Sequence, residues 1–394
     1  MVIHGKNLNR SASLIAIKGE RFLSLKKGLL VGSLSGLVVG LFFGCFIASQ
    51  RIHDLQSQVE NMERNMLPLR SLADARGILV GTAVSAAPLR NEALYAETLS
   101  REFNILTAEN AMKFESIHPA QNLYLFDDAD AIVSFAEANN LKVRGHTLVW
   151  HNQLPSWISM GSFSREEWIN ILRDHITTVV SRYQGRIYAW DVVNEAVNDD
   201  GSLRDTVWLR NIGPEYLDLA FRWAHEADPN ALLFYNDYGG EGLNQKSNAI
   251  YDLVKGLLDR GVPVNGVGLQ MHVSLEYSPS SQEVAENMAR LSKLGLDVHI
   301  TELDVRLGLP VTEEKLAAQA RIYQELLEVC LNADNCKAFV MWGFTDRYSW
   351  ISSFFRGYDS ALIFDSAYHA KPAYYALWRC LLNSSFGQEP SNGS

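Results

Sequence analysis

Hydrophobic and polar positions divide the chain into a short N-terminal part and a longer part with a different pattern. Residues 28–48 contain no charged side chain. A helix over this stretch is about 31 Å long, enough to cross the hydrocarbon core of a membrane. The preceding segment, 1–27, carries six Lys or Arg residues and one Glu, and such a positive excess stays on the cytoplasmic side. We therefore expect a basic cytoplasmic N-terminus over 1–27, a single transmembrane helix over 28–48 and an extracytoplasmic remainder.

A cleaved signal peptide is the alternative for this apolar stretch. The apolar region of a signal peptide usually has about 7–15 residues and ends before a small-x-small cleavage site. The stretch 28–48 is longer, and Ile47-Ala48-Ser49 is a poor cleavage site. The residues before Cys45 match a lipoprotein signal only weakly. The pattern therefore favours an uncleaved anchor in the cell membrane, with secretion after cleavage as the alternative.

A helical stalk is expected directly after the anchor, over 49–70. Between Ile52 and Leu69 apolar residues recur at alternating steps of three and four, a heptad pattern of under three heptads. Within the anchor, glycines recur every four residues, a spacing that lets membrane helices approach closely. Both patterns are compatible with a homodimer formed through the transmembrane helix and the stalk.

Strands and helices alternate from Ser71 almost to the C-terminus. Eight short runs rich in β-branched and aromatic residues are separated by segments of helical periodicity. Eight such units predict a (β/α)8 TIM barrel of the α/β class over 71–385, followed by a flexible tail, 386–394. A doubly wound sheet is the alternative, but it gives no reason for eight strands. The expected strands are 78–82, 103–107, 142–147, 187–193, 232–236, 266–271, 297–301 and 337–342.

The expected helices have recognisable ends. Asp127 and Ser164 are residue types that cap helix N-termini, because their side-chain oxygens accept hydrogen bonds from the first turn. Gly261 and Gly295 follow helical segments and are typical C-terminal stops. The expected helices include 129–138, 165–183, 216–227, 248–260, 282–294 and 313–330.

Polar and aromatic residues follow seven of the expected strands. The active site of a TIM barrel lies at the C-terminal ends of its strands, so these side chains are expected to meet at one end of the barrel. A helix cap or a solvated edge explains one such residue, but not a series of strand ends. The residues are Glu109, Asn110, Lys113, His146, Trp150, Asn194, Glu195, Tyr238, Gln270, His272, Glu302, Asp304, Trp342 and Trp350.

These residue types indicate a neutral ligand rich in hydroxyl groups. Amides and carboxylates hydrogen-bond to hydroxyls, and flat indoles cover the apolar face of a sugar ring. No Cys/His cluster has zinc spacing, and no glycine-rich phosphate loop or dinucleotide fingerprint occurs, so no metal and no cofactor are expected. The net charge of -10 argues against a nucleic-acid partner. Two glutamates on different strands are then a candidate acid/base and nucleophile pair.

Five motifs, in the order of the chain, resemble glycoside hydrolase family 10. Residues 190–195 read Trp-Asp-Val-Val-Asn-Glu and residues 299–304 read His-Ile-Thr-Glu-Leu-Asp, which look like the two signatures of the family. The resemblance covers roughly 71–382 and implies a (β/α)8 barrel with retaining endo-β-1,4-xylanase activity on xylan or xylo-oligosaccharides. Phe114 is one departure, because the family usually has Trp after the lysine of the second-strand motif. The other three motifs are 145–151, 270–272 and 342–346.

The resemblance also implies a role for each site residue. Glu195 is expected to be the general acid/base and Glu302 the nucleophile. Asn194 is expected to bind the 2-hydroxyl of the sugar being cleaved, and Asp304 to orient His272 beside the nucleophile. The other implied substrate-binding residues are Glu109, Asn110 and Lys113 on the glycone side, His146, Trp150, Trp342 and Trp350 around the ring at the cleavage point, Gln270 beside the nucleophile, and Tyr238 on the leaving-group side.

Two other functions remain open from the sequence. A β-1,4-glucanase would act on rings that carry an additional hydroxymethyl group, which a crowded glycone subsite would reject, and the sequence does not measure that crowding. A catalytically silent carbohydrate-binding ectodomain is the alternative from another class. The presence of both glutamates together with Asn194 and His272 argues against a silent domain.

Cysteine usage bears on the compartment. Cys330 and Cys336 bracket the turn between the last long expected helix and the last expected strand. In an oxidising compartment they could form a small-loop disulfide, an arrangement that some members of the family resemble. Two buried thiols are the alternative. Cys45 lies within the apolar stretch 28–48, where its lipidation stays an open question.

Overall fold

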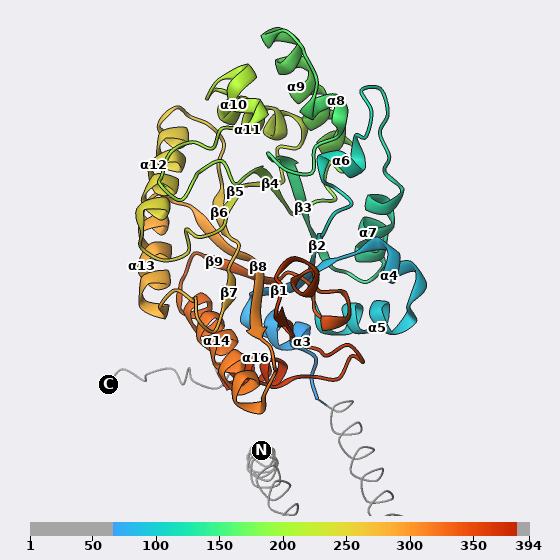
Figure 1. The fold of residues 1–394 in the computed structure, drawn as a ribbon, viewed down its shortest axis with the longest axis vertical. Helices are drawn as coiled ribbons and strands as arrows, with labels where there is room; N and C mark the ends of the chain where they lie inside the picture. The colour runs from blue at the N-terminus through green and yellow to red at the C-terminus, as the bar shows by residue number, and fades with distance from the viewer. Residues whose placement is uncertain (1–65, 384–394) are drawn as a thin grey trace, which may run out of the picture. The chain divides into compact units, whose positions relative to one another are not determined.

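A closed barrel of parallel strands forms the centre of the computed structural model, which describes residues 66–383. Within this range eight strands follow the order β8-β6-β5-β4-β3-β2-β1-β9, and pairing of β8 with β9 closes the ring. Figure 1 shows the helices outside the strands. The predicted TIM barrel is therefore confirmed. The barrel strands are β1 (Leu79–Val84), β2 (Ile105–Ala108), β3 (Lys142–Val149), β4 (Ala189–Asn194), β5 (Leu232–Asp237), β6 (Gly266–Leu269), β8 (Asp297–Gly308) and β9 (Cys336–Met341).

Each barrel strand coincides with one of the predicted β-prone runs. Parallel strands in a barrel are covered on the outside by helices and filled on the inside by side chains, so they read as nearly continuous apolar runs. The strand β4 is buried at every position, and β1 at every position except its first. This two-sided burial is why sequence periodicity could locate the strands.

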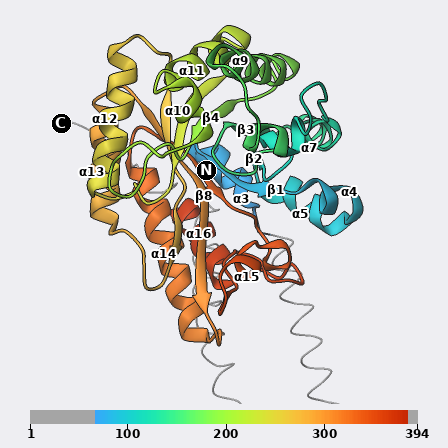
Figure 2. The same cartoon turned by 45° about the horizontal axis from the view of Figure 1, so that its top comes forward.

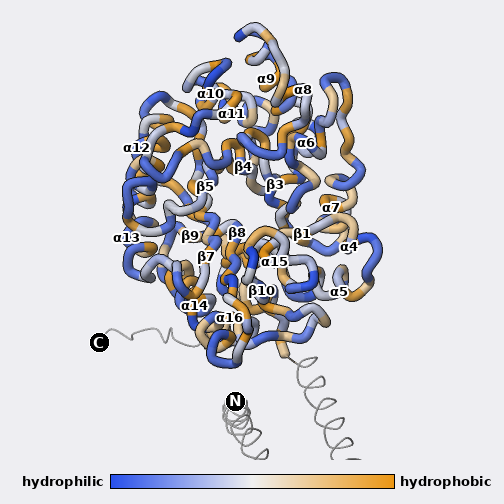
Figure 3. Tube along the Cα trace, viewed as in Figure 1, coloured by the Kyte–Doolittle hydropathy of each residue, from blue (hydrophilic) through white to orange (hydrophobic). Residues whose placement is uncertain are grey.

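The helices bury one face against the barrel and expose the other. Along their length hydrophilic and hydrophobic residues alternate (Figure 3), which is the pattern of a helix lying on a core. The principal helices of the described chain are α3 (Leu69–Arg76), α5 (Ala93–Glu102), α7 (Asp127–Ala138), α9 (Arg165–Arg182), α11 (Tyr216–Ala227), α12 (Gln245–Asp259), α13 (Ser281–Ser292), α14 (Glu313–Asn332) and α16 (Pro372–Asn383). Shorter ones are α4 (Ala86–Asn91), α6 (Phe114–Ile117), α8 (Ser156–Ser159), α10 (Val207–Ile212), η1 (Asp346–Tyr348) and α15 (Ile351–Phe354).

Three of the four predicted helix boundaries are confirmed. Ser164 caps α9 through a reciprocal capping box with Glu167, and Gly261 and Gly295 adopt φ angles of 66° and 78°, the left-handed conformation that ends a helix. The prediction for Asp127 was wrong: it is the first residue of α7, and Phe126 occupies the cap position. At that position its carboxylate still interacts favourably with the positive end of the helix dipole.

The compact unit begins at Leu67, earlier than the start predicted at Ser71. Leu69, predicted to lie in the stalk, is fully buried as the first residue of α3, and its N–H donates to Glu102 Oε2 at 3.0 Å. The indole N–H of Trp378 in α16 donates to the Leu67 carbonyl oxygen at 2.9 Å. The last position of the apparent heptad pattern, Leu69, therefore belongs to the core of the barrel domain.

The expected cytoplasmic N-terminus 1–27, the transmembrane helix 28–48, most of the stalk 49–70 and the tail 386–394 lie outside the described residues. Among the helices between residues 66 and 383, none has the length and apolar character needed to cross a membrane.

The strand β8 extends well past the barrel (Figure 2). Two short strands pair with this extension: β7 (His272–Ser274) in parallel register and β10 (Tyr358–Asp359) in antiparallel register. Since side chains on a strand alternate between faces, Glu302, Asp304 and Arg306 share one face of β8. The extension thus carries one row of charged side chains outward from the end of the barrel.

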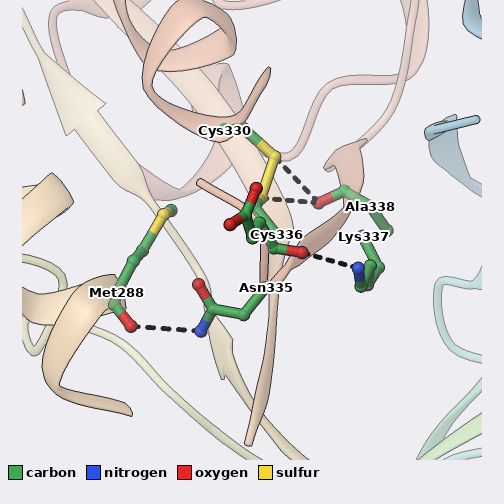
Figure 4. The surroundings of a disulfide bond; sticks show 7 residues. Met288, Cys330, Asn335, Cys336, Lys337 and Ala338 are labelled. Carbon is green, nitrogen blue, oxygen red and sulfur yellow. Dashed lines mark hydrogen bonds between the residues drawn. A yellow bond between two sulfur atoms is a disulfide. The ribbon is translucent and has the colours of Figure 1, made fainter. Parts of the chain in front are cut away.

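A disulfide joins Cys330 at the end of α14 to Cys336 at the start of β9 (Figure 4). Asn335, which precedes Cys336, donates from Nδ2 to the carbonyl oxygens of Met288 and Leu296 at 3.1 and 3.0 Å. The covalent link and these hydrogen bonds fix the turn at the end of the barrel where β9 begins. The predicted site residues lie at the opposite end of the barrel, where the strands end.

Candidate active site

A pocket of about 1000 Å³ opens where the barrel strands end. Its wall contains residues from seven of the barrel strands or from the loops that follow them. Most residues named by the strand-end argument line this pocket, whereas their roles in catalysis and binding stay predictions. The predicted residues that line this pocket are Lys113, His146, Trp150, Asn194, Glu195, Tyr238, Gln270, His272, Glu302, Trp342 and Trp350.

Three predicted residues do not line the pocket directly. Asp304 lies behind it and contacts two lining residues: its Oδ2 is 2.8 Å from His272 Nδ1 and accepts from Trp350 Nε1 at 2.8 Å. Asn110 is exposed and accepts a hydrogen bond from Lys113 Nζ at 2.9 Å. Glu109 lies beside them, where burial raises its pKa and the charge of Lys113 partly offsets that rise.

Phe114 also lies away from the pocket wall. Its ring stacks on the buried His175 with a centroid distance of 3.8 Å, and it packs against Trp157 and Trp208. The ring at this position therefore packs between α6 and α9. The departure from the family pattern lies behind the pocket wall and not in it.

Glu302 lies on β8 among hydrogen-bond donors. Its Oε1 accepts from Asn236 Nδ2 at 2.7 Å, and its Oε2 accepts from His272 Nε2 at 3.2 Å. Burial would raise the pKa of Glu302, but His146 and the hydrogen-bonded, charged His272 outweigh burial, so the pKa lies below its usual value. Glu302 is therefore a buried carboxylate that stays ionised.

His272 keeps its positive charge because it lies between two carboxylates. Burial alone would lower its pKa, yet Asp304 and Glu302 together raise it to about 10. The hydrogen bond to Asp304 Oδ2 holds one ring nitrogen, so the other donates to Glu302. The side chain is 15% exposed, so the imidazolium forms part of the pocket wall.

Asn236, at the end of β5, was not predicted as a site residue. Its Nδ2 donates both to Glu302 Oε1 at 2.7 Å and to Asn194 Oδ1 at 2.8 Å, and its Oδ1 accepts from Thr301. A Cβ atom at Gly268 on the neighbouring strand would lie 2.1 Å from Asn236 Oδ1, so only glycine leaves room for this amide. The strand-end rule places Asn236 at the end of its strand, as it does Asn194, but nothing in the sequence assigned it a role.

Glu195 follows directly after β4 and has different surroundings. Its Oε2 accepts from Trp150 Nε1 at 2.9 Å and its Oε1 from Gln270 Nε2 at 3.0 Å. The Gln270 amide, expected beside the nucleophile, thus contacts the other glutamate. Its φ angle of 58° is a left-handed conformation that is uncommon for a residue with a side chain and that clusters at functional sites. The Arg204 side chain donates to its carbonyl oxygen at 2.8 Å and helps to hold this conformation.

One histidine, His151, lies near Glu195, but unlike His272 beside Glu302 it is uncharged. His151 Nδ1 is 3.9 Å from Glu195 Oε2. Burial lowers the pKa of His151, and the positive charges of Arg204 and Lys246 lower it further against the opposing effect of Glu195. At neutral pH this imidazole is uncharged, so the donors that contact the Glu195 carboxylate are the neutral indole and amides.

A buried network beneath the pocket holds His146. Asp191 on β4 accepts from Arg144 Nε at 3.0 Å and lies 3.0 Å from His146 Nδ1. Burial would raise the pKa of Asp191, but Arg144 and His146 lower it below the usual value, so it is a carboxylate. Arg144 and Asp191 were not predicted, because their contact depends on the register in which β3 pairs with β4.

A lysine that was not predicted lies on the Tyr238 side of the pocket. Lys246 Nζ lies 3.6 Å from the centroid of the Tyr238 ring and 3.1 Å from Asp237 Oδ1. Burial raises the pKa of Asp237 to about 7, with Lys246 opposing the rise. Lys246 lies at the start of α12, away from any strand end, so the strand rule could not identify it.

No group of three His, Cys, Asp or Glu side chains within 66–383 is placed to hold a metal ion. The chemistry that this part of the chain offers is that of two carboxyl groups in one pocket. One is ionised beside an imidazolium, and the other lies among neutral donors. Such a pair can combine nucleophilic attack with proton transfer at a glycosidic bond.

Comparison with known proteins agrees with this arrangement. One relative, endo-1,4-beta-xylanase B of Thermotoga neapolitana, is 47% identical over 79% of this chain and 90% of its own length. Another, exoglucanase XynX of Acetivibrio thermocellus, is 41% identical over 76% of this chain but only 28% of its own length. The crystal structure of xylanase 10B from Thermotoga petrophila in complex with xylobiose matches with a TM-score of 0.79 and 48% identity, covering 81% of this chain and 98% of that one.

The range of the family match coincides with the barrel domain. The family model for Glycosyl hydrolase family 10 matches residues 68–380, which includes α3 as well as every barrel strand. With this extent of match, and with the relatives above, the chain belongs to glycosyl hydrolase family 10.

Proposed function

We propose that this protein is an endo-β-1,4-xylanase that cleaves xylan with retention of configuration. The observation that carries the proposal is the contrast between Glu302, ionised beside charged His272, and Glu195, bonded to the Trp150 indole and the Gln270 amide. The xylanase names of the relatives and the xylobiose complex support xylan as the substrate.

Glu302 is the nucleophile in this mechanism. Its lowered pKa keeps it ionised, and the donors Asn236 and His272 orient it toward the pocket. The carboxylate attacks the anomeric carbon and forms a glycosyl-enzyme while the bond to the leaving oxygen breaks. Asp304 acts through His272, which it holds in the orientation that donates to Glu302.

Glu195 is the general acid and then the general base. It gives its proton to the glycosidic oxygen as that bond breaks, and afterwards takes a proton from the water that hydrolyses the glycosyl-enzyme. The hydrogen bonds from Trp150 and Gln270 fix the carboxyl group on the pocket wall. The glycosidic oxygen is a poor leaving group unless it is protonated, and transfer of the proton needs a carboxyl group held in a fixed position.

The remaining lining residues bind the sugar chain. Asn194, held by Asn236, is placed to bond the 2-hydroxyl of the ring that is attacked. Trp342 and Trp350 cover apolar ring faces, and Lys113, bonded to Asn110 and Gln153, binds hydroxyls on the glycone side with support from Glu109. His146 lies beside the ring at the cleavage point and Tyr238 on the leaving-group side.

Glucan is the second candidate substrate, and the relative named an exoglucanase supports it. The test compares release of reducing ends from xylan and from carboxymethylcellulose, with nuclear magnetic resonance of the first product anomer. We expect faster release from xylan and an initial β-anomer. Faster release of reducing ends from carboxymethylcellulose would show that glucan, and not xylan, is the preferred substrate. No turnover on xylan or on an activated aryl xylobioside would indicate the silent binding domain.

We further propose that residues 28–48 anchor the catalytic domain outside the cytoplasmic membrane and that two chains pair through this helix and the stalk. The charge-free length and the basic residues of 1–27 support this topology. Mass spectrometry of the membrane fraction should find peptides from 1–27, and cross-linking there should yield dimers. A mature chain that begins near Ser49 and is free in the medium would contradict the anchor.

A further inference from the structure

A cation lines the pocket beyond Glu302 on the same strand. Arg306 lines the pocket together with Trp350, Phe354 and Phe355. It shares a face of β8 with Glu302, four residues along the strand, which corresponds to about 13 Å. The pocket therefore extends from the carboxylates to a second region of different character, which we call the Arg306 region: Arg306, Trp350, Phe354 and Phe355.

The guanidinium of Arg306 has few polar contacts. Nη1 donates to the Val273 carbonyl oxygen at 3.5 Å, the long limit of a hydrogen bond, and Nε is buried without a hydrogen-bond partner in the described part of the chain. No carboxylate between residues 66 and 383 forms an ion pair with it, whereas the pocket lysine Lys246 is paired with Asp199 and Asp237. Nε is enclosed by protein, so it is the unpaired charge of the guanidinium that calls for a ligand.

Aromatic rings hold the guanidinium in place. It lies 4.4 Å from the centroid of Phe355 and 5.6 Å from that of Tyr358, so two rings fix it by cation–π contact. Phe354 packs against Trp350 with centroids 5.0 Å apart and is 70% exposed. A preformed, planar cation beside an exposed ring matches a sugar that carries a carboxylate, because the fork of Arg suits carboxylates and the ring covers a sugar face.

We propose that Arg306 binds the carboxylate of a uronic acid substituent on the xylan chain, so that the enzyme favours acid-substituted xylan. This inference rests on the proposed function, because it assumes a xylan chain in the pocket. The position on β8 makes it compatible with the active site: about 13 Å of strand separates the two Cα atoms, and Coulomb repulsion falls with separation.

The test uses a xylo-oligosaccharide that bears one glucuronic acid and the same compound with its carboxyl reduced to a hydroxymethyl group. The two substrates have nearly the same shape and differ in charge. We expect full-length wild-type protein to cleave the acid with a kcat/KM about tenfold higher, the scale of a charge-assisted hydrogen bond. The variant Arg306→Gln should bring the ratio close to one, and salt should reduce the wild-type ratio.

Arg356→Gln is the matched control. Arg356 is exposed two residues after Phe354, and it is outside the pocket wall, so its loss changes the net charge without changing the site. This variant should keep the wild-type ratio. If Arg306→Gln lowers kcat/KM equally for both substrates, Arg306 merely supports the strand β7 through Val273 and the proposal is overturned.

A binding measurement separates this inference from the proposed function. Calorimetry with the Glu302→Gln variant needs no turnover and compares the affinities for the acid and its reduced form. Tighter binding of the acid, lost when Arg306→Gln is added, supports the carboxylate site even if neither compound is cleaved. Equal affinities for both compounds would refute the site whether or not the protein hydrolyses xylan.

Discussion

Glu302 and Glu195 are the same residue type in one pocket, but their surroundings differ in charge. Glu302 accepts from a charged histidine whose pKa is raised to about 10 by two carboxylates. Glu195 accepts from a neutral indole and a neutral amide, and burial together with neighbouring cations lowers the pKa of the nearest histidine, His151. The difference depends on partners that neighbouring strands and their loops contribute.

This comparison explains how one fold supports two opposite tasks. A nucleophile has to be ionised before the substrate arrives, and a general acid has to hold and then release a proton. Fixed positive charge suits the first task, whereas neutral donors orient a carboxyl group without fixing its charge. The variants below test whether the two glutamates are divided in this way, beginning with the largest effect.

Removal of the Glu302 carboxylate should have the largest effect. We expect Glu302→Ala to lower kcat by about 10⁴-fold or more on every substrate, including an aryl xylobioside with a good leaving group, because no attacking group remains. Single-turnover kinetics and mass spectrometry should detect no glycosyl-enzyme, and calorimetry should show xylotetraose bound with nearly wild-type affinity. Activity on the aryl substrate within tenfold of wild type would show that Glu302 is not the nucleophile.

Removal of the Glu195 carboxyl should have a smaller effect that depends on the substrate. We expect Glu195→Ala to lower kcat/KM on xylan by about 10²- to 10⁴-fold, the usual range for general acid catalysis. The loss should be at least tenfold smaller on the aryl xylobioside, since its leaving group needs no proton. Equal losses on both substrates would contradict the division of tasks.

The sequence predicted the barrel and most of the pocket for a physical reason. Strands buried on both faces leave continuous apolar runs, and the strand-end rule then identified Glu195, Glu302 and their neighbours. It missed contacts that depend on the register between strands, such as the Arg144–Asp191 pair beneath His146. It also placed Leu69 in the stalk, because a buried helix residue and a heptad position look alike in a short apolar pattern.

The charged His272 predicts a pH-dependent contribution to stability. An imidazole whose pKa is about 10 in the folded protein and 6.5 when free stabilises the fold fully below pH 6.5 and loses that effect as the pH rises through 10. We expect His272→Gln to lower the free energy of unfolding by about 2 kcal/mol at pH 6, with the gap closing toward pH 10. Denaturant titrations at several pH values measure it.

The control for this stability effect is His369→Gln. His369 also lies near a carboxylate, with Nδ1 3.1 Å from Asp365 Oδ2, but its side chain is 76% exposed. Water screens an exposed pair, so this variant should change stability little at any pH. A pH-independent gap for His272→Gln would mean that the charge of His272 contributes nothing and that only its packing matters.

The smallest expected effect comes from a single hydrogen bond on the Glu195 side. Trp150→Phe keeps a ring on the pocket wall but removes the N–H that donates to Glu195 Oε2 at 2.9 Å. We expect kcat/KM on xylan to fall about tenfold, which corresponds to one charge-assisted hydrogen bond. On the aryl xylobioside the fall should be within about twofold, because a substrate that needs no proton does not depend on where the carboxyl group points.

Trp342→Phe provides the comparison for that variant. Trp342 lines the same pocket and contacts His146, yet its indole N–H makes no hydrogen bond to either glutamate in the range 66–383. Replacement of the Trp342 indole by the smaller ring should therefore lower kcat/KM alike for xylan and the aryl xylobioside, through weaker ring contacts with the sugar. If Trp150→Phe also affects both substrates alike, Trp150 is only a sugar platform, and neutral donors do not position Glu195 for proton transfer.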